Sequence, residues 1–536
     1  MPKKSHVLLS LAAAAVVAVP IAVATSASAG EKAPEPALKL VAATQTVNYD
    51  RYGDDPTVWL DLGAHVVAGA SPFELAISRA SYHDPIVAKQ VIVKNGVKTT
   101  KTLPKGLVTN FSGLSKFLHV TIADSAGKKL VERDDTFCPN GNGNRSRPDA
   151  PATSQYPQVC GRLPFALASV WGLQKGWSIN TAGFDFESAP LELPDGTYNV
   201  TASVNKPHRD AFGIPANKSS ITVKLVVRTL EDPGGPSPTG SPAPTGTPSP
   251  TSAATAHGHH ASGHHGTVAG QSGPRDTRPK GFANKPAKSR PVGKAAVPAQ
   301  GPRPDLRAVP AWQIYLGGAP DGPGGGFVKG APEYLSFSAN VWNAGPSPLV
   351  VDGFRRSGTD LMDAYQYFYD ANGKQTGWAP SGTMEWDPRE GHTHWHFTDF
   401  ATYRLLDSTK KVAVRSGKEA FCLAPTDPVN LNVKGANWKP SSTDLSTACG
   451  GITALAVRQA LEVGWGDTYS QSLPGQSFDV TGVPNGTYYI EVKANPVKRL
   501  FESDFNNNTS LRKVILGGKP GARTVTVPPY ELIDAP

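Results

Sequence analysis

Two stretches of this chain repeat each other, and the repeat limits the possible folds more than any other feature of the sequence. Matching motifs occur in the same order and at similar spacing: Pro194-Asp195-Gly196-Thr197-Tyr198 with Pro484-Asn485-Gly486-Thr487-Tyr488, Phe137-Cys138 with Phe421-Cys422, Cys160-Gly161 with Cys449-Gly450, Gly176-Trp177 with Gly464-Trp465, and Ala123-Asp124-Ser125 with Leu406-Asp407-Ser408. We therefore expect two copies of one domain within the chain.

Both copies contain short segments rich in β-branched and aromatic residues, separated by turn residues, which is typical of β-strands. The segments include 118–122, 198–204, 335–341, 401–406 and 488–494. Glycine and proline, with 54 and 49 residues among 536, supply the many turns that short strands need. The sequence predicts an all-β protein with two tandem β-sandwich domains.

The composition changes sharply between the two copies. Residues 233–251 are a Pro/Ser/Thr/Gly repeat, and residues 256–265 contain five histidines. Such segments do not carry enough apolar surface to form a core. We expect a disordered Pro/Gly/His-rich linker at residues 231–302, between an N-terminal domain at 30–230 and a C-terminal domain at 303–536.

The end of this linker is basic. Residues 266–300 hold seven Lys and Arg side chains against one acid, Asp276. The tract is broken by proline and glycine, which argues against a nucleic-acid platform. Two interpretations stay open for it, a solvated linker and a loose contact with an anionic cell wall. The histidine run also has two interpretations. It could bind metal weakly near a site, or it could be a low-complexity sequence without a function.

The N-terminus has the pattern of an export signal. Lys3 and Lys4 precede an apolar stretch at 7–24, and Ala27-Ser28-Ala29 forms a small-residue cleavage site. We expect residues 1–29 to be a signal peptide. The mature protein is then secreted and extracellular, with no membrane segment after cleavage, in a compartment where disulfides persist.

Three histidines form the strongest chemical motif. His392, His394 and His396 are the only histidines from residue 301 to the end of the chain. On a β-strand, residues at i, i+2 and i+4 point to one side, so the three imidazoles would lie together. The neighbouring Trp395 and Phe397 favour a strand. Neutral imidazole is a common ligand of copper and zinc, so we predict a metal site.

The four cysteines allow three disulfide pairings. Because Cys138 and Cys160 correspond to Cys422 and Cys449 in the repeat, we expect one disulfide within each copy, Cys138–Cys160 and Cys422–Cys449. Each would close a loop of some 20 to 30 residues and stabilise the fold by about 3–4 kcal/mol.

Two further motifs lie around the second cysteine pair. Ser416-Gly417-Lys418-Glu419-Ala420-Phe421-Cys422 places a lysine four residues before a cysteine, and Gly464-Trp465-Gly466-Asp467-Thr468-Tyr469 places a tyrosine after its partner. Together with the histidine motif and the later Glu502-Ser503-Asp504-Phe505-Asn506-Asn507-Asn508, this region resembles the catalytic domain of the lysyl oxidases. The resemblance covers roughly residues 336–518.

The resemblance implies a cofactor and a metal. In that family three histidines bind copper, which corresponds here to His392, His394 and His396. A lysine and a tyrosine become a lysine tyrosylquinone, which corresponds to Lys418 and Tyr469. The implied activity is the oxidative deamination of primary amines, either free amines or peptidyl lysine, by oxygen. Asp467 and Asp504 are both candidates for the general base.

The first copy lacks these residues. Asp134 stands four residues before Cys138, where the second copy has Lys418. Thr181 stands four residues after Trp177, where the second copy has Tyr469, and His119 is alone on its expected strand. We expect the first domain to be non-catalytic and to bind, position or stabilise.

The sequence thus predicts a secreted copper- and quinone-dependent amine oxidase that releases aldehyde, ammonia and hydrogen peroxide. One alternative is a secreted copper-binding or cell-surface binding protein that never forms the quinone. Another is a cupin-like metalloenzyme, but a cupin needs a further distant histidine, which residues 301–536 do not contain. Detection of the quinone separates the oxidase from both.

Overall fold

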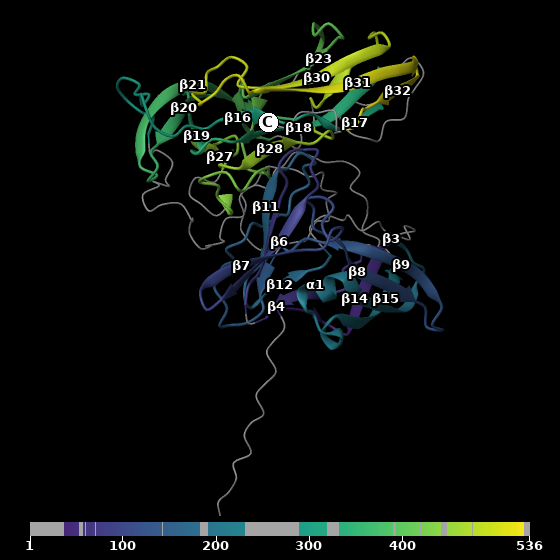
Figure 1. Cartoon of the computed structure of the whole chain (residues 1–536). Coiled ribbons are helices and arrows are strands. Elements are labelled where there is room, and N and C mark those ends of the chain that lie inside the picture. Colours follow the sequence, from purple (N-terminus) through teal and green to yellow (C-terminus); the bar gives the residue numbers. More distant parts are fainter. Residues whose placement is uncertain are drawn as a thin grey trace, which may run out of the picture. The chain divides into compact units, whose positions relative to one another are not determined.

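The computed structural model describes residues 37–52, 57–58, 60–69, 71–141, 143–182, 191–230, 289–318, 332–389, 393–416, 420–440, 447–473 and 475–529. These residues form β-strands joined by turns, with one α-helix, α1 (Lys206–Phe212), and one short 3-10 helix, Ala216–Lys218. The all-β fold class predicted from the sequence is confirmed (Figure 1). No helix within the described ranges is long and apolar enough to cross a membrane. The predicted signal peptide lies outside these ranges.

The strands of residues 37–230 form four sheets, drawn in purple to teal in Figure 1. A five-stranded sheet has the order β2-β15-β14-β8-β9, two four-stranded sheets have the orders β1-β4-β12-β10 and β11-β5-β6-β7, and β13 pairs with β3. The bounds are β1 (Leu38–Ala42), β2 (Thr46–Tyr52), β3 (Thr57–Val58), β4 (Ala64–Ala68), β5 (Phe73–Ser78), β6 (Val87–Lys94), β7 (Val97–Thr102), β8 (Leu114–Ala123), β9 (Lys129–Phe137), β10 (Gly143–Arg145), β11 (Ala168–Leu173), β12 (Trp177–Asn180), β13 (Leu191–Glu192), β14 (Gly196–Val204) and β15 (Ser220–Leu230).

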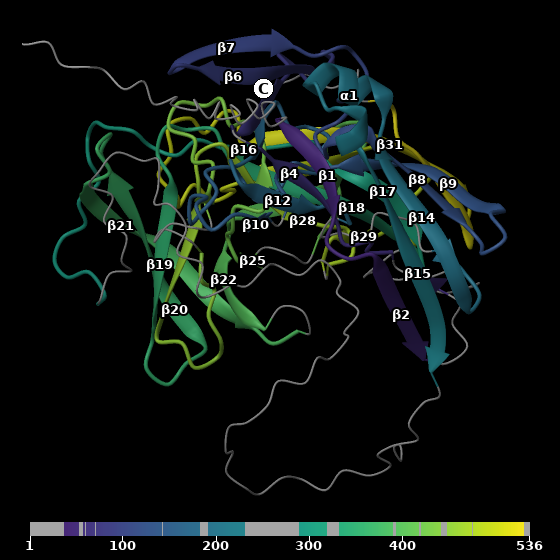
Figure 2. The same ribbon diagram turned by 90° about the horizontal axis from the view of Figure 1, so that it is seen from below.

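The strands from residue 306 onward form three sheets. One has the order β16-β18-β28-β26, with β17 and β29 also pairing with β18; the others have the orders β25-β22-β21-β20-β19-β27 and β24-β23-β30-β31-β32. The bounds are β16 (Leu306–Ala308), β17 (Trp312–Gly317), β18 (Tyr334–Asn343), β19 (Leu349–Arg355), β20 (Leu361–Tyr369), β21 (Gln375–Asp387), β22 (His394–Thr398), β23 (Ala401–Leu406), β24 (Val412–Arg415), β25 (Ala420–Phe421), β26 (Asp427–Pro428), β27 (Ala456–Leu461), β28 (Trp465–Tyr469), β29 (Ser477–Asp479), β30 (Gly486–Ala494), β31 (Thr509–Lys519) and β32 (Ala522–Thr526). Figure 2 shows β19 to β22 as neighbouring green strands.

The repeated motifs make the same hydrogen bonds in both halves of the chain. The hydroxyl of Tyr198 donates to the carbonyl of Pro194 at 2.7 Å, and that of Tyr488 donates to the carbonyl of Pro484 at 2.8 Å. Each tyrosine thereby fixes the loop that leads into its own strand, β14 or β30. The repeat found in the sequence is therefore also a repeat of backbone geometry.

The corresponding hairpin turns of the two copies also make the same hydrogen bond. The Asp124 carboxylate accepts the Lys128 amide at 2.9 Å, and the Asp407 carboxylate accepts the Lys411 amide at 3.0 Å. Both predicted disulfides, Cys138–Cys160 and Cys422–Cys449, are formed, with Cα–Cα distances of 5.8 and 6.0 Å. The predicted cysteine pairing is confirmed, whereas the domain boundaries given above stay a prediction.

A buried carboxylate explains part of the 502–508 motif. Glu502 accepts hydrogen bonds from the side-chain amides of Asn495 and Asn508, both at 2.7 Å, and from the backbone amide of Leu306 at 2.8 Å. These partners lie at the end of β30, before β31 and at the start of β16. A buried polar group of this kind needs such partners, so Glu502 has a structural role that ties three strands together.

The two halves also contact each other within one compact unit, residues 36–536. The amide of Leu167 donates to the carbonyl of Val429 at 2.6 Å, and the amide of Leu431 donates to the carbonyl of Ala168 at 3.0 Å. Val429 follows β26, which pairs with β28. The last part of the predicted linker is also tied to a strand, because Ala296 exchanges two backbone hydrogen bonds with Trp378 of β21.

A buried histidine in the first half predicts a pH-dependent stability. His208 of α1 is 2% exposed and packs against Phe117, with ring centroids 5.2 Å apart. Burial lowers the pKa of His208 to about 4, whereas an unfolded histidine titrates near 6.5. The unfolded chain therefore binds the extra proton first, so this contribution to stability is complete above about pH 6.5 and is lost as the pH falls towards 4.

Chemical denaturation between pH 7 and pH 4 tests this prediction. The unfolding free energy of the wild type should fall by about 3 kcal/mol more than that of His208→Leu over this range. The exposed His83 provides a control, because His83→Leu should keep the pH dependence of the wild type. Equal losses in the wild type and His208→Leu would contradict the assignment.

Candidate functional site

Two histidines of the motif, His394 and His396, lie on β22, between β21 and β25. His394 and His396 project from the same side of the strand, and their ring centroids are 4.7 Å apart. His396 is buried, and His394 is half-buried. His392 lies outside the described residues. The alternation of side chains along a strand therefore brings two of the three predicted metal ligands together.

Trp395, between these two histidines, fixes the strand from its other side. Its backbone amide donates to the carbonyl of Cys449 at 3.1 Å, and its indole nitrogen donates to the carbonyl of Gly451 at 3.0 Å. The indole is fully buried and meets Trp386 edge to face at 5.9 Å. The position of the two imidazoles thus depends on the chain segment that carries the second disulfide.

Gln459 of β27 connects β22 to the segment that contains Cys422, the disulfide partner of Cys449. Its side-chain nitrogen donates to the carbonyl of Trp395 at 2.7 Å, and its side-chain oxygen accepts the amide of Leu423 at 3.1 Å. Gln459 is fully buried. Since Leu423 follows Cys422, one glutamine side chain holds the histidine strand and the cysteine segment at a fixed separation.

Asp387, at the end of β21, contacts the histidine motif directly. Its Oδ2 atom lies 3.3 Å from Nδ1 of His396, and it also receives the guanidinium of Arg389 at 2.6 Å. Burial acts to raise the pKa of Asp387, but the hydrogen bonds from His396 and Arg389 outweigh it and hold the pKa well below its usual range. The sequence alone does not single out Asp387, because only the pairing of β21 with β22 brings it to the histidines.

Tyr469, the predicted cofactor tyrosine, lies at the end of β28 and is 1% exposed. Its hydroxyl donates to the carbonyl of Cys422 at 3.1 Å, and its ring meets Phe421 edge to face at 4.7 Å. Phe421 pairs with Phe397, the residue after His396. Phe421 therefore contacts both the tyrosine ring and the histidine strand.

The two candidate bases lie in different surroundings. Asp467 is 1% exposed and shares the side of β28 that carries Tyr469; burial and this carboxylate together raise the pKa of Tyr469 well above its ordinary value. Asp504 lies in a turn, where it accepts the amide of Asn506 at 2.8 Å. Packing thus places Asp467, and not Asp504, beside the predicted cofactor residue.

Lys418 lies outside the described residues, but the residues on either side of it are anchored near this cluster. The amide of Ser416 donates to the carbonyl of Tyr403 at 3.2 Å, and Ala420 pairs with Thr398 of β22. The Tyr403 ring in turn meets Phe421 edge to face at 5.8 Å. Ser416 is thus attached to β23 and Ala420 to β22, and both of these strands contact Phe421.

Within the described ranges, no group of three or more His, Cys, Asp or Glu side chains is placed to hold a metal ion. The two described imidazoles, His394 and His396, nevertheless lie side by side, and neutral imidazole is a common ligand of copper and zinc. The carboxylate of Asp387 contacts Nδ1 of His396. The third predicted ligand, His392, is not among the described residues.

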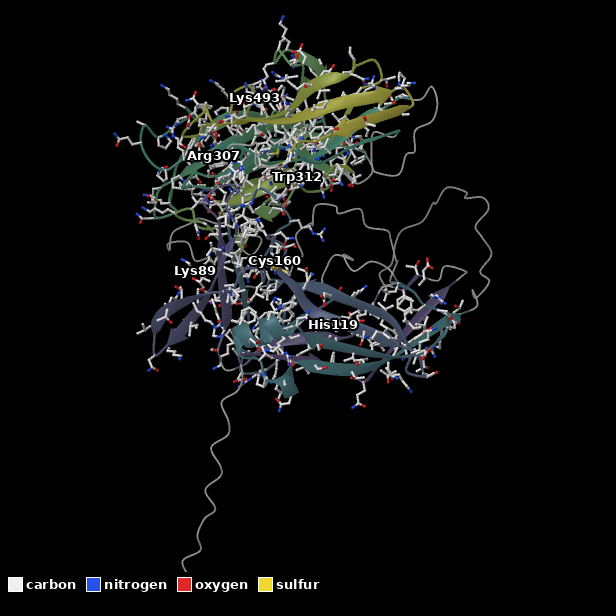
Figure 3. All side chains as sticks on the ribbon, turned by 45° about the vertical axis from the view of Figure 1, so that its right-hand side comes forward. Lys89, His119, Cys160, Arg307, Trp312 and Lys493 are labelled. Carbon is white, nitrogen blue, oxygen red and sulfur yellow. A yellow bond between two sulfur atoms is a disulfide. The ribbon has the colours of Figure 1, made fainter. Side chains whose placement is uncertain are left out.

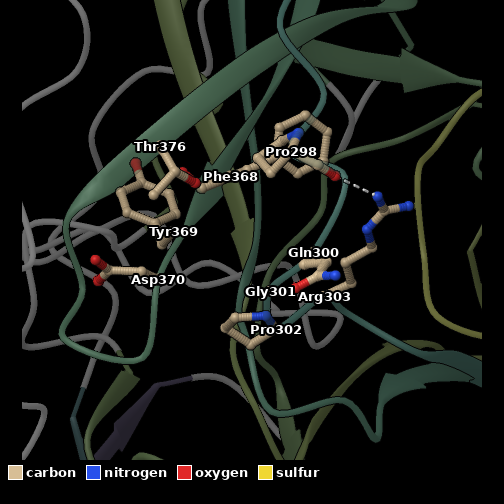
Figure 4. A pocket seen from close by; sticks show the side chains of 9 residues that line it. All are labelled: Pro298, Gln300, Gly301, Pro302, Arg303, Phe368, Tyr369, Asp370 and Thr376. Carbon is tan, nitrogen blue, oxygen red and sulfur yellow. Dashed lines mark hydrogen bonds between the residues drawn. The ribbon is translucent and has the colours of Figure 1, made fainter.

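A small cavity lies at the other end of β21. It measures about 30 Å³, is lined by Pro298, Arg303, Phe368, Tyr369 and Thr376 among others, and has room for water only (Figure 4). Thr376 and Asp387 are separated along one extended strand by roughly 35 Å. This cavity is therefore not part of the histidine and tyrosine cluster.

Comparison with known proteins identifies this region. The model of the family described as lysyl oxidase matches residues 369–522, a range that contains all five predicted site residues. Residues 369–522 belong to the lysyl oxidase family. The rest of the chain lies outside this match.

Several curated relatives resemble the lysyl oxidase domain. Human lysyl oxidase homolog 1 is 34% identical over 131 residues, which cover 24% of this chain and 20% of the relative. Pig protein-lysine 6-oxidase is 31% identical over 152 residues, which cover 27% of this chain and 53% of the relative. Mouse lysyl oxidase homolog 4 is 30% identical over 129 residues, covering 24% and 15%. The chain thus spans at most about half the length of these relatives.

The first half of the chain uses its matching positions differently from the lysyl oxidase domain. His119, labelled in Figure 3, lies on β8 with Nδ1 3.0 Å from Asp134 and Nε2 3.2 Å from Glu132, both on the neighbouring β9. Asp134, at the position that corresponds to Lys418, therefore contacts the ring of His119. The non-catalytic role of the first copy stays a prediction.

The role of Gln459 can be tested against a matched residue on β20. Gln366 is also fully buried and makes two hydrogen bonds to the backbone, both to Phe501. Gln459→Leu and Gln366→Leu should each lower stability by about 2–5 kcal/mol, because each leaves a buried donor and a buried acceptor unpaired. Hydrogen exchange should quicken in β22 only for Gln459→Leu. Unchanged exchange in β22 would show that other contacts hold this strand.

Proposed function

We propose that the lysyl oxidase domain oxidises primary amines with oxygen, either as lysine side chains or as free amines. In the balanced reaction, the amine R–CH2–NH2, oxygen and water give the aldehyde R–CHO, ammonia and hydrogen peroxide. The amine loses two electrons and two protons to oxygen. The observation that carries the proposal is that the strand of His394 and His396 and the ring of Tyr469 both contact Phe421, while the Tyr469 hydroxyl donates to the carbonyl of the next residue, Cys422.

The proposed metal is copper, bound by His392, His394 and His396. The proposed cofactor is a lysine tyrosylquinone formed from Lys418 and Tyr469. When present, the metal and the quinone supply the two-electron acceptor that no ordinary side chain provides. Two features of the described residues support this assignment. The imidazoles of His394 and His396 lie side by side, and the hydroxyl of Tyr469 donates a hydrogen bond to the carbonyl of Cys422.

The protein groups around Tyr469 perform separate tasks. Phe421 packs edge to face against the buried ring of Tyr469 and is itself packed against Tyr403, so these aromatic rings help to exclude water from the tyrosine. Asp467 is the carboxylate that we assign to accept the proton that the substrate carbon loses during oxidation. Asp467 is 1% exposed and lies on the same side of β28 as Tyr469, which places its carboxylate next to the proposed cofactor residue.

The site of action is part of the proposal. Both disulfides persist in an oxidising compartment, which agrees with the export signal expected at residues 1–29. We therefore propose that the protein acts outside the cell. Contact of the basic linker with an anionic cell wall stays a proposal that rests on the sequence alone.

Replacing Tyr469 tests the cofactor. In copper-loaded wild-type protein exposed to air, a tryptic digest should contain one cross-linked pair of peptides with Lys418 and Tyr469, and amine-dependent hydrogen peroxide should form. Tyr469→Phe should lose both. Tyr488→Phe is the matched control, because Tyr488 is also a buried tyrosine whose hydroxyl donates to a backbone carbonyl, and it should keep both.

The opposite outcome selects the alternative function. If the wild-type peptides with Lys418 and Tyr469 appear separate and unmodified although copper is bound, the oxidase proposal fails. A secreted copper-binding or cell-surface binding protein would then be the better description.

A second pair of variants tests the assigned base. Asp467→Asn should lower amine turnover about 100-fold or more, the usual effect of removing a general base, and should alter the pH profile. Asp504→Asn should stay within a factor of about 3, because an asparagine side chain can still accept the Asn506 amide. Equal activity in both variants would exclude Asp467 as the base.

A further inference from the structure

We propose that Asp387 is a positioning residue for the metal site and determines which ring nitrogen of His396 binds copper. The inference rests on the proposed copper site described above. It starts from one contact, the 3.3 Å approach of Asp387 Oδ2 to Nδ1 of His396. Both side chains are more than nine-tenths buried, at 7% and 1% exposed, so water does not weaken this contact.

The contact with Asp387 determines the tautomer of His396, that is, which ring nitrogen carries the proton. An ionised carboxylate only accepts hydrogen bonds, and a neutral imidazole carries one N–H group. With Asp387 at Nδ1, that nitrogen holds the proton and donates it to the carboxylate. The lone pair then remains on Nε2, on the opposite side of the ring from Nδ1, and Nε2 becomes the nitrogen that would bind the metal. Carboxylates that contact metal-binding histidines act in this way in many metal sites.

Asp387 is itself held in place. Arg389 donates from Nε to Oδ1 at 2.9 Å, from Nη2 to Oδ2 at 2.6 Å and from its backbone amide to Oδ1 at 3.0 Å. A two-pronged contact between a guanidinium and a carboxylate fixes orientation as well as charge. The carboxylate therefore presents Oδ2 to His396 in one orientation, and the turn after β21 carries the group that maintains it.

The pairing of β21 with β22 explains why Asp387, and not Glu385, contacts the ring of His396. Asp387 lies opposite His394, and Glu385 lies opposite His396, so all four side chains share one side of the two strands. Glu385 is exposed, whereas Asp387 is buried and reaches diagonally to His396. Glu385 therefore offers a control carboxylate that places the same charge near the site without the contact to the ring.

Copper affinity of the full-length protein tests the inference. Competition with a chelator should show copper binding about 10–100-fold weaker in Asp387→Asn than in the wild type. Glu385→Gln should remain within a factor of about 3, because it removes the same charge at an exposed position. The electron paramagnetic resonance spectrum of the bound copper should change in Asp387→Asn and remain that of the wild type in Glu385→Gln.

Three results would overturn the inference. Copper affinity and spectrum could be unchanged in Asp387→Asn, which would leave Asp387 with a role in the turn alone. Glu385→Gln could weaken binding as much, which would point to charge rather than position. The wild type could bind no copper. Amine oxidation is a separate measurement, so a protein that binds copper through this arrangement but oxidises no amine would contradict the proposed function and leave this inference standing.

Discussion

Two imidazoles can act together only if the strand that carries them has a fixed position. In this protein, the hydrogen bonds of Trp395 fix the position of that strand, β22. The amide, the carbonyl and the indole of this one residue each make a hydrogen bond, to Cys449, to Gln459 and to Gly451 respectively. Its ring is buried in the same apolar cluster as Tyr469. Because the residue alternates with His394 and His396, every contact that fixes the tryptophan also fixes the histidines on the other side of the strand.

The second disulfide completes this framework. Cys449 accepts a hydrogen bond from the histidine strand, while its partner Cys422 accepts the hydroxyl of Tyr469. One covalent bond therefore connects the residues that position the histidines and the residue that positions the tyrosine. The chemistry assigned to Lys418 and Tyr469 needs such a framework, because a short movement of either partner would separate groups that must react.

The sequence predicted the features that depend on local spacing or on the repeat. The i, i+2, i+4 spacing of His392, His394 and His396 predicted a strand with its histidines on one side, and β22 has that geometry for the two that are described. The repeat predicted both disulfides. The sequence did not indicate Asp387 or Gln459, because their importance comes from strand register and from contacts between residues far apart in the chain. Asp467 and Asp504 were equivalent in the sequence, and only packing separated them.

The repeated framework also affects how the chain can fold. A protein with two copies of one hydrogen-bonding pattern offers each strand a second partner of similar shape, and tandem copies are prone to exchange elements during folding. Each disulfide here joins cysteines only 22 or 27 residues apart. Cysteines this close in the chain meet far more often than cysteines in different copies. Oxidation thus favours a disulfide within each copy over one that would join the two copies.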